Sequence, residues 1–319
     1  MGHAYLVYNP AAGRFPSTML TERAAQVLRT QGWSVQLEKT MGGSHITELA
    51  HQAVSENAAA FFVAGGDGSI NHAIAGLVGS STALGVLPAG TANVWAQELG
   101  LSGLTWTRLM ALEESARRLA TAPVHSVDVG FCNRVPFLLW AGVGLDGFIV
   151  NRIEPRSRWE KHFAVVQYAA SAVWGASTWS GMNLRVSVDG EQVYGHFLLA
   201  VASNIHLYAG GLAEISPMAR LDDGVMDLWL FSGDTLGETV RLALDMLAGK
   251  HQESEKTRRI PFRDLNLTSD SSLYVQLDGE PVEGGYSVDF EVKTRGLRVF
   301  VPEGVSRRLF SDSVSSGKG

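Results

Sequence analysis

Residues 61–75 read Phe-Phe-Val-Ala-Gly-Gly-Asp-Gly-Ser-Ile-Asn-His-Ala-Ile-Ala. The apolar run at 61–64 has the length and composition of a buried strand. Glycines follow at once, and Ser69 can cap a helix in which apolar side chains recur at helical spacing. A strand, a glycine turn and a helix together present backbone N–H groups and the positive end of a helix dipole to a phosphate. The stretch therefore predicts a phosphate-binding turn within an α/β domain.

Asp67 stands inside this glycine turn, where a carboxylate repels a phosphate. The repulsion is relieved if a divalent cation, or a hydroxyl that is losing its proton, lies between the two groups. Gly-Gly-Asp-Gly therefore favours metal-assisted phosphoryl transfer over simple anion binding. An ordinary turn with a solvated aspartate is the alternative that this stretch alone leaves open. No Gly-Lys-Ser/Thr follows and the first turn lacks G-x-G-x-x-G, which excludes a P-loop and a dinucleotide fingerprint.

The composition sets broad limits on the class of protein. The chain has 319 residues, enough for two domains, and its formal net charge of −6 argues against nucleic-acid binding. Cys132 is the only cysteine, so no intramolecular disulfide can form, which fits a cytoplasmic location. Polar residues interrupt the most apolar long window, 163–179, so we expect no transmembrane segment.

Strand and helix patterns alternate over residues 1–123, which predicts a Rossmann-like α/β domain with a mainly parallel sheet. Three of the expected strands end in Pro- or Gly-containing turns that begin at Asn9, Gly65 and Pro88. Ligands of such sheets bind at the carboxyl ends of the strands. We therefore expect the three turns to share one edge of the sheet.

The pattern of apolar and turn-forming residues changes after Pro123. Short apolar runs separated by Gly, Asp and Asn turns, with few helical stretches, predict an antiparallel β-sandwich over residues 124–295. A last strand at 297–301 can return to the first domain, which would add residues 296–310 to it. The polar tail at 311–319 is expected to be disordered.

Six blocks of sequence occur in order along the chain. They are Asn9-Pro10-x-x-Gly13, Gly65-Gly66-Asp67-Gly68-Ser69-Ile70-Asn71, Pro88-x-Gly90-Thr91-x-Asn93, Tyr208-Ala209-Gly210-Gly211, Pro217-x-Ala219-x-Leu221-Asp222-Asp223-Gly224 and Leu277-Asp278-Gly279-Glu280. Together they resemble the diacylglycerol kinase catalytic family, which includes sphingosine kinases and soluble bacterial lipid kinases of the YegS and DgkB type. The resemblance spans nearly the whole chain. It implies a nucleotide-binding α/β domain, a β-sandwich domain for the lipid substrate, and an active site in the cleft between them.

The resemblance also implies roles for particular residues. ATP would be contacted by Asn9, Pro10, Ala11, Ala12, Gly13, Thr40, Gly65, Gly66, Asp67, Gly68, Ser69, Ile70, Asn71 and Thr91. Magnesium would be held by the side chain of Asp223 and the backbone carbonyls of Arg220 and Val225. Glu280 would accept the proton of the lipid hydroxyl, with Asp278 in the same turn, and Asp67 would lie at the metal and phosphate end. Whether Glu280 or Asp67 is the general base stays open.

These roles fit the chemistry, because phosphoryl transfer needs positioning, charge neutralisation and a nearby carboxylate base. The residues alone also allow plainer readings. Asp-Gly between strands is a strong hairpin signal, so Asp278 and Glu280 can belong to an ordinary turn. Asp222-Asp223-Gly224 can be a surface turn, and Asp128 is either a carboxylate behind the site or a polar residue at a strand edge.

Some positions depart from the family pattern. Ala11 and Ala12 replace hydroxyl residues of the first block, and Val94 stands where many bacterial diacylglycerol kinases carry Asp. Ala209 replaces a glycine of the usual Gly-Gly-Gly. The departures leave the kinase interpretation intact but weaken a specific assignment to diacylglycerol.

The sequence thus predicts an ATP- and Mg²⁺-dependent kinase that phosphorylates the hydroxyl of diacylglycerol or a related lipid. The alternatives are an NAD kinase-like or other small-molecule kinase, and a binding regulator without chemistry. The expected partner is a lipid at a membrane surface, with no nucleic acid; a homodimer is open. Tryptophans and basic residues over 152–179 indicate either core packing or an interfacial helix.

Overall fold

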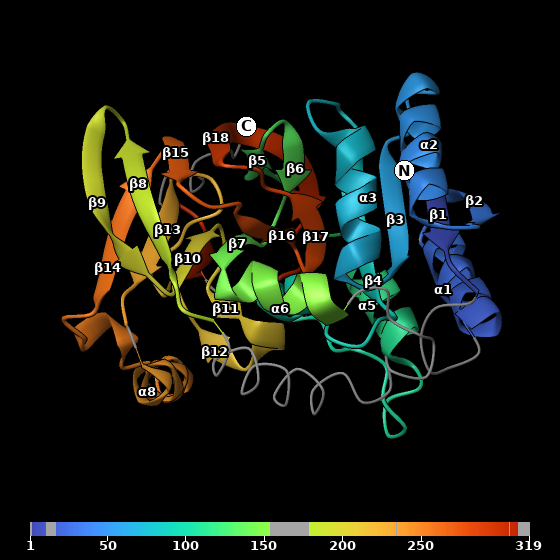
Figure 1. Ribbon diagram of the computed structural model, residues 1–319. Helices are drawn as coiled ribbons and strands as arrows, with labels where there is room; N and C mark the ends of the chain where they lie inside the picture. The colour runs from blue at the N-terminus through green and yellow to red at the C-terminus, as the bar shows by residue number, and fades with distance from the viewer. Residues whose placement is uncertain (1, 11–16, 154–178, 234, 306, 312–319) are drawn as a thin grey trace. The chain divides into compact units, whose positions relative to one another are not determined.

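The computed structural model describes residues 2–10, 17–153, 179–233, 235–305 and 307–311 (Figure 1). The predictions for Ala11, Ala12 and Gly13, for the segment 154–178 and for the tail 312–319 lie outside these residues. The chain divides into two compact units. The first unit comprises Met1–Val129, Leu221–Asp223 and Thr294–Gly319, and the second Gly130–Arg220 and Gly224–Lys293.

The first unit contains a parallel sheet, which confirms the predicted α/β class. Its strand order is β2 (Ser34–Lys39), β1 (His3–Tyr8), β3 (Ala60–Gly65), β4 (Ala83–Pro88) and the end of β18 (Ser287–Phe300). The residues of β3 and β4 are buried along their full length, as expected of a parallel sheet flanked by helices. The helices described here are α1 (Ser17–Thr30), α2 (Gly43–Ser55), α3 (Asp67–Leu77), α4 (Val94–Glu98) and α5 (Ala111–Ala120).

The strand register brings the predicted turns to one edge. Tyr8 lies opposite both Lys39 and Ala64, and Gly65 lies opposite Pro88. Because these pairings are parallel, the chain leaves all four strands at the same edge of the sheet. The expectation that the turns share this edge is confirmed, and Thr40, which follows β2, joins them there.

The second unit is built from antiparallel sheets, as the short alternating runs predicted. One sheet contains β15 (Asp264–Ser269), β8 (Met182–Val188), β9 (Glu191–Phe197) and the beginning of β18. The other has the order β14 (Thr257–Phe262), β13 (Met226–Phe231), β10 (Leu199–Ser203), β7 (Trp140–Gly144), β16 (Tyr274–Leu277) and β17 (Glu280–Glu283). The remaining strands are β5 (Val124–Cys132), which begins in the first unit, and the short strands β6 (Val135–Phe137), β11 (Leu207–Tyr208) and β12 (Ala213–Glu214).

Two helices of the second unit matter for the site: α6 (Leu145–Ile153), which follows β7, and α8 (Leu236–Leu247). Ala209–Gly211 forms a short turn with positive φ angles, and short 3₁₀ turns cover His251–Glu253 here and Arg307–Leu309 in the first unit. Within the part of the chain that the structure describes, no helix is long and apolar enough to cross a bilayer.

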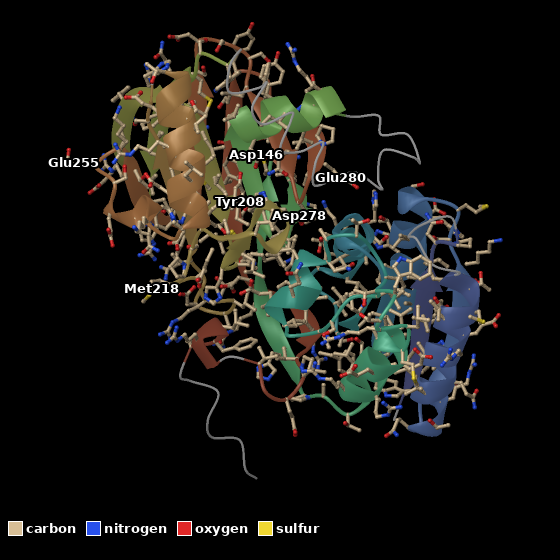
Figure 2. The ribbon with its side chains drawn as sticks, turned by 90° about the horizontal axis from the view of Figure 1, so that it is seen from below. Asp146, Tyr208, Met218, Glu255, Asp278 and Glu280 are labelled. Carbon is tan, nitrogen blue, oxygen red and sulfur yellow. The ribbon has the colours of Figure 1, made fainter. Side chains whose placement is uncertain are left out.

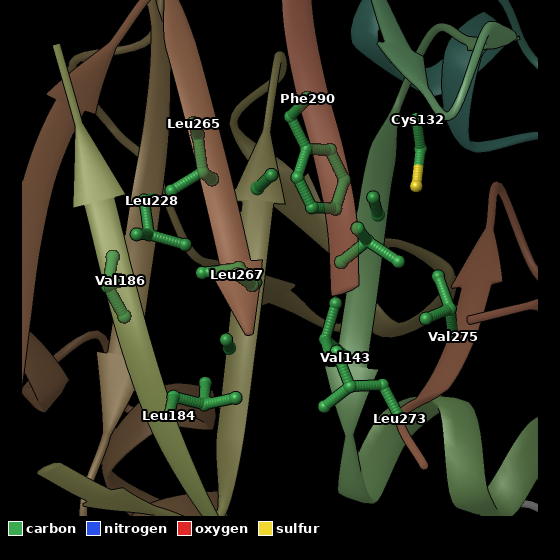
Figure 3. Close-up of a cluster of buried hydrophobic side chains, with 14 of the residues drawn as sticks. Cys132, Val143, Leu184, Val186, Leu228, Leu265, Leu267, Leu273, Val275 and Phe290 are labelled. Carbon is green, nitrogen blue, oxygen red and sulfur yellow. The ribbon is translucent and has the colours of Figure 1, made fainter. Parts of the chain in front are cut away.

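The core of the second unit lies between its sheets (Figure 3). Side chains alternate along β8, so that Leu184 and Val186 are buried while Arg185 is exposed. They meet Leu228 of β13 and Leu265 of β15 in one cluster. Burial of each such side chain stabilises the fold by about 1.5–3 kcal/mol. The two-residue periodicity of the sequence thus produces a sandwich with a continuous apolar interior.

Candidate functional site

The glycine turn leads directly from β3 into α3. Gly66 precedes the helix with extended backbone, and its carbonyl oxygen accepts from the N–H groups of Ser69 and Ile70 at 3.0 and 3.1 Å. The prediction that Ser69 caps this helix is wrong, because α3 begins two residues earlier, at Asp67, and Gly66 is its cap. Strand, glycine turn and helix are otherwise arranged as residues 61–75 predicted.

The turn that follows β4 is closed by Asn93. Its side-chain oxygen accepts from the N–H of Gly90 at 2.9 Å, and its amide nitrogen donates to the Gly90 carbonyl at 2.9 Å. Asn93 is buried and has a left-handed backbone, φ 56°, which Asn tolerates better than most residues. The Gly-Thr-x-Asn block therefore folds as one closed turn that leaves Thr91 exposed.

The two turns pack backbone against backbone. A β-carbon added to Gly90 would lie 2.4 Å from the α-carbon of Gly66 and 2.9 Å from its nitrogen. No side chain fits on Gly90 at that separation, and a β-carbon on Gly66 would lie a tight 3.2 Å from the α-carbon of Gly90, so glycine lets the turns meet.

We expect Gly90→Ala to lower the free energy of unfolding by about 1–3 kcal/mol, the usual cost of overpacking a close contact. Gly42→Ala is the matched control, because a β-carbon there meets nothing within 4 Å and its φ is 170°. Urea denaturation of both variants measures the difference. Equal stability of the two would show that the contact between the turns is not tight.

Asp67 links the glycine turn to α4. Its Oδ2 accepts from the N–H of Val94 at 2.9 Å, and its Oδ1 accepts from the N–H of Trp95 at 3.1 Å. These are the first two residues of α4, whose own cap residue, Asn93, makes no side-chain cap bond. A carboxylate at a helix N-terminus is stabilising, so Asp67 caps a helix that is distant in sequence. Burial raises the pKa of Asp67, and the hydrogen bonds from Val94 and Trp95 oppose that shift.

Thr40 supplies a polar group at the same sheet edge. Its backbone N–H donates to the carbonyl of Tyr8 at 2.8 Å, and the residue is only 2% exposed. Its hydroxyl is buried and has no hydrogen-bond partner within the described ranges. An unsatisfied buried hydroxyl costs free energy, so this atom is suited to meet a ligand.

The Asp-Gly-Glu block forms a two-residue hairpin turn between β16 and β17. Asp278 and Gly279 both have positive φ, 50° and 88°, and Leu277 pairs with Glu280. The hairpin that the sequence offered as the plainer reading is therefore the actual backbone.

The two carboxylates of this hairpin have different surroundings. The oxygens of Asp278 accept from the backbone N–H groups of Leu138, Leu139 and Trp140 at 2.8, 2.9 and 3.1 Å. Asp278 is buried, whereas Glu280, at the start of β17, is partly exposed. Asp278 thus holds the turn against the start of β7, and Glu280 is the carboxylate that the turn presents.

Sequence reasoning missed Asp146 and Gln276. The Gln276 side-chain nitrogen donates to Oδ2 of Asp146 at 2.7 Å, and its oxygen accepts from the Gly279 N–H at 2.7 Å. Burial raises the pKa of Asp146, and hydrogen bonds from Tyr208 and Gln276 oppose that shift. Figure 2 shows Asp146 and Tyr208 in the same part of the second unit as Asp278 and Glu280.

A signal for Asp146 existed in the sequence. Gly144-Leu145-Asp146-Gly147 follows a buried strand and opens a helix, as Gly66-Asp67-Gly68 does. The resemblance to Gly-Gly-Asp-Gly is partial, and a contact between residues 130 positions apart has no local signature.

The expected magnesium ligands have a suitable donor set. One carboxylate and two backbone carbonyls, from Asp223, Arg220 and Val225, are hard oxygen ligands of the kind that Mg²⁺ takes. Asp223 is exposed, whereas the neighbouring Asp222 is buried and accepts from the N–H of Ser311 at 2.6 Å. Among the described residues, no three or more His, Cys, Asp or Glu side chains gather as a metal cluster. The magnesium assignment stays a prediction.

Asp128 is fully buried on β5. Its side chain accepts from the N–H of Arg295 at 2.6 Å, and its own N–H donates to the carbonyl of Leu221 at 2.6 Å. Arg295 has a positive φ of 51°. Asp128 therefore holds β18 at a residue with positive φ, which is a structural task that the sequence alone did not distinguish.

Comparison with known proteins adds an independent line of evidence. Residues 3–132 match the family model described as the diacylglycerol kinase catalytic domain, and residues 141–301 match the YegS C-terminal NAD kinase beta sandwich-like domain. A probable lipid kinase YegS-like from Chromohalobacter salexigens is 29% identical over 88% of this chain and 87% of its own. A diacylglycerol kinase from Bacillus subtilis is 24% identical over 97% and 99%. The crystal structure of a putative diacylglycerol kinase from Bacillus anthracis has a TM-score of 0.76 at 19% identity, covering 95% and 98%.

Proposed function

The chain belongs to the diacylglycerol kinase family of lipid kinases, and from this premise we propose that it transfers a phosphoryl group from ATP, with Mg²⁺, to the hydroxyl of diacylglycerol or a related lipid. One observation carries the proposal: the Asp-Gly-Glu hairpin keeps one carboxylate buried on three backbone N–H groups and presents the other. We assign Glu280, the presented carboxylate, the role of the base that would accept the proton of the acceptor hydroxyl.

The sheet edge of the first unit supports ATP binding. The turns at Asn9, at Gly65 to Asn71 and at Thr91 offer backbone groups, and the buried hydroxyl of Thr40 has no partner among the described residues. Main-chain N–H groups at a helix N-terminus suit phosphate oxygens. Pro10 adjoins this edge, and the proposal extends to Ala11, Ala12 and Gly13, which lie outside the described residues.

Magnesium would supply charge neutralisation on the phosphoryl group when bound. Asp223 would hold it through its side chain, and Arg220 and Val225 through their carbonyl oxygens. Asp67 keeps its proposed place near the phosphates, in addition to its hydrogen bonds with α4.

A panel of acceptors tests the proposed function. The purified protein is given ATP and Mg²⁺ with diacylglycerol, monoacylglycerol, sphingosine or NAD, and products are identified by mass. We expect a phosphorylated lipid. Formation of NADP alone would instead support a small-molecule kinase. We test NAD because the family model that matches the second domain is described as NAD kinase beta sandwich-like. No phosphorylated product from any acceptor would contradict kinase activity altogether.

Work at a membrane surface is part of the proposal, and α8 supports it. Val240, Leu244 and Leu247 recur on one stripe of this helix and are 43%, 60% and 56% exposed. The acidic residues of α8 are paired, Glu238 with Lys256 and Asp245 with Arg241. An outward apolar stripe with neutralised acids suits the surface of a bilayer, where the lipid acceptor resides. We propose a cytoplasmic protein that associates peripherally with membranes through this stripe.

Replacing Val240, Leu244 and Leu247 together by Glu is expected to lower binding to phosphatidylglycerol-containing vesicles by about tenfold or more, since burying each such side chain contributes about 1.5–3 kcal/mol. Vesicle flotation measures the bound fraction. Met41→Glu with Trp106→Glu is the control, because both side chains are strongly exposed in the first unit. Equal flotation of the two variants would contradict a role for α8. If the wild type is a dimer and the α8 variant is a monomer, the stripe would instead be a contact with a second copy of the chain.

A further inference from the structure

Asp146 reaches the Asp-Gly-Glu hairpin through a single side chain. Gln276 is buried on β16, donates from Nε2 to Asp146 and accepts from the Gly279 N–H through Oε1, both at 2.7 Å. An amide group has one donor end and one acceptor end. The Oδ2 atom of Asp146 accepts from the Nε2 end of Gln276, which leaves the oxygen end for the Gly279 N–H. Gln276 must then turn its oxygen toward Gly279.

Two glycines make room for this arrangement. Gly142 of β7 lies opposite Gln276 in the register, and a β-carbon there would come within 2.2 Å of the Asp146 Oδ2 atom and 2.7 Å of the Gln276 Nε2 atom. A β-carbon on Gly147 would lie 2.3 Å from the carbonyl oxygen of Tyr274. Helix α6 therefore lies directly on β16, with the Asp146 carboxylate over the Gln276 amide.

We propose that Asp146 is a positioning residue: through Gln276 it holds the Gly279 amide, and with it the hairpin from which Glu280 acts on the acceptor hydroxyl. The inference rests on the proposed role of Glu280. Without the carboxylate, the Gln276 amide is free to rotate by half a turn. Its NH₂ group would then face the Gly279 N–H, and the hairpin would lose a hydrogen bond just before Glu280.

Asp146→Ala and Asp146→Asn form the test, because Asn keeps an oxygen that can accept from Gln276. We expect Ala to lower kcat with the lipid acceptor by about tenfold or more, as small misplacements of reacting groups do. The KM of the Ala variant for ATP should stay within about twofold of the wild-type value, because the nucleotide edge is unchanged. The kcat of the Asn variant should stay within about threefold of the wild-type value, because its oxygen can keep the hydrogen bond with Gln276. Gln276→Met should match Ala, and the Asp146→Ala/Gln276→Met double variant should lose no more than either alone.

Three outcomes would overturn the inference: wild-type kcat in Asp146→Ala, equal losses in the Ala and Asn variants, or additive losses in the double variant. If Asp146→Ala fails to fold, Gln276→Met replaces it in the test, and we expect the same lowered kcat with an unchanged KM for ATP. Glu280→Gln separates this inference from the proposed function. Full activity in Glu280→Gln would contradict the proposed base, whereas an inactive Glu280→Gln with a normal Asp146→Ala would refute the positioning role alone.

Discussion

Glu280→Gln is expected to lower kcat for lipid phosphorylation by about 10²–10⁴-fold, the usual contribution of a general base. The amide has the shape of the carboxylate but cannot accept the proton of the acceptor hydroxyl. Glu280 lies at the first position of β17 and is partly exposed, so the substitution leaves the sheet intact. We therefore expect the KM for ATP and the melting temperature to stay close to those of the wild type.

Glu283→Gln is the matched control for this prediction. Glu283 is the last residue of the same strand and is exposed. It carries the same change of charge at a position away from the hairpin turn. Initial rates at saturating ATP and Mg²⁺ compare the two variants. Equal rates for Glu280→Gln and Glu283→Gln would rule out Glu280 as the base.

The location of the site follows from short-range sequence patterns. The strand, glycine turn and helix over residues 61–75 and the turn after β4 are local structures, and parallel register then brings them to one edge. The two-residue alternation along strands such as β8 likewise predicts the sandwich. These features could be predicted from the sequence because each depends on residues within a few positions of one another.

The partners of the buried carboxylates could not be predicted in the same way. Asp67 meets backbone groups 27 and 28 positions away, and Asp278 meets groups about 140 positions away. Such contacts arise from tertiary packing and leave no spacing in the sequence. Ser69 shows the reverse error: a good capping residue is passed over because the helix begins at Asp67.

The departures from the family pattern also gain a physical meaning. Val94, where many bacterial diacylglycerol kinases carry Asp, is buried at the start of α4, and its N–H donates to Asp67. Ala209 has a positive φ of 51°, as do the glycines after it, at 74° and 87°. Alanine at such a position costs about 1–2 kcal/mol relative to a relaxed backbone. The glycine of other members is therefore explained by backbone conformation.

Asp67→Ala is expected to lower the free energy of unfolding by about 2–4 kcal/mol, because two backbone N–H groups lose a charged acceptor. Asp67→Asn should cost less, since its amide oxygen can still accept from one of them. Glu22→Ala, on the exposed face of α1, is the control. Urea denaturation measures the three variants. Wild-type stability in Asp67→Ala together with lost activity would confine Asp67 to the phosphate and metal, and would refute its role at α4.

The pH dependence of the same comparison tests the burial of Asp67. Its pKa is raised above the ordinary value of 3.8 by burial. A raised carboxyl pKa means that the folded state binds the proton more tightly than the unfolded state. The stabilisation from this group is complete below the ordinary value and is lost as the pH rises through the folded-state pKa. The stability difference between the wild type and Asp67→Asn should therefore be larger at pH 4 than at pH 7. The other carboxyl groups titrate alike in both proteins, so their contributions cancel in this comparison. A stability difference that grows with pH would show that the hydrogen bonds from Val94 and Trp95 affect the pKa of Asp67 more than burial does.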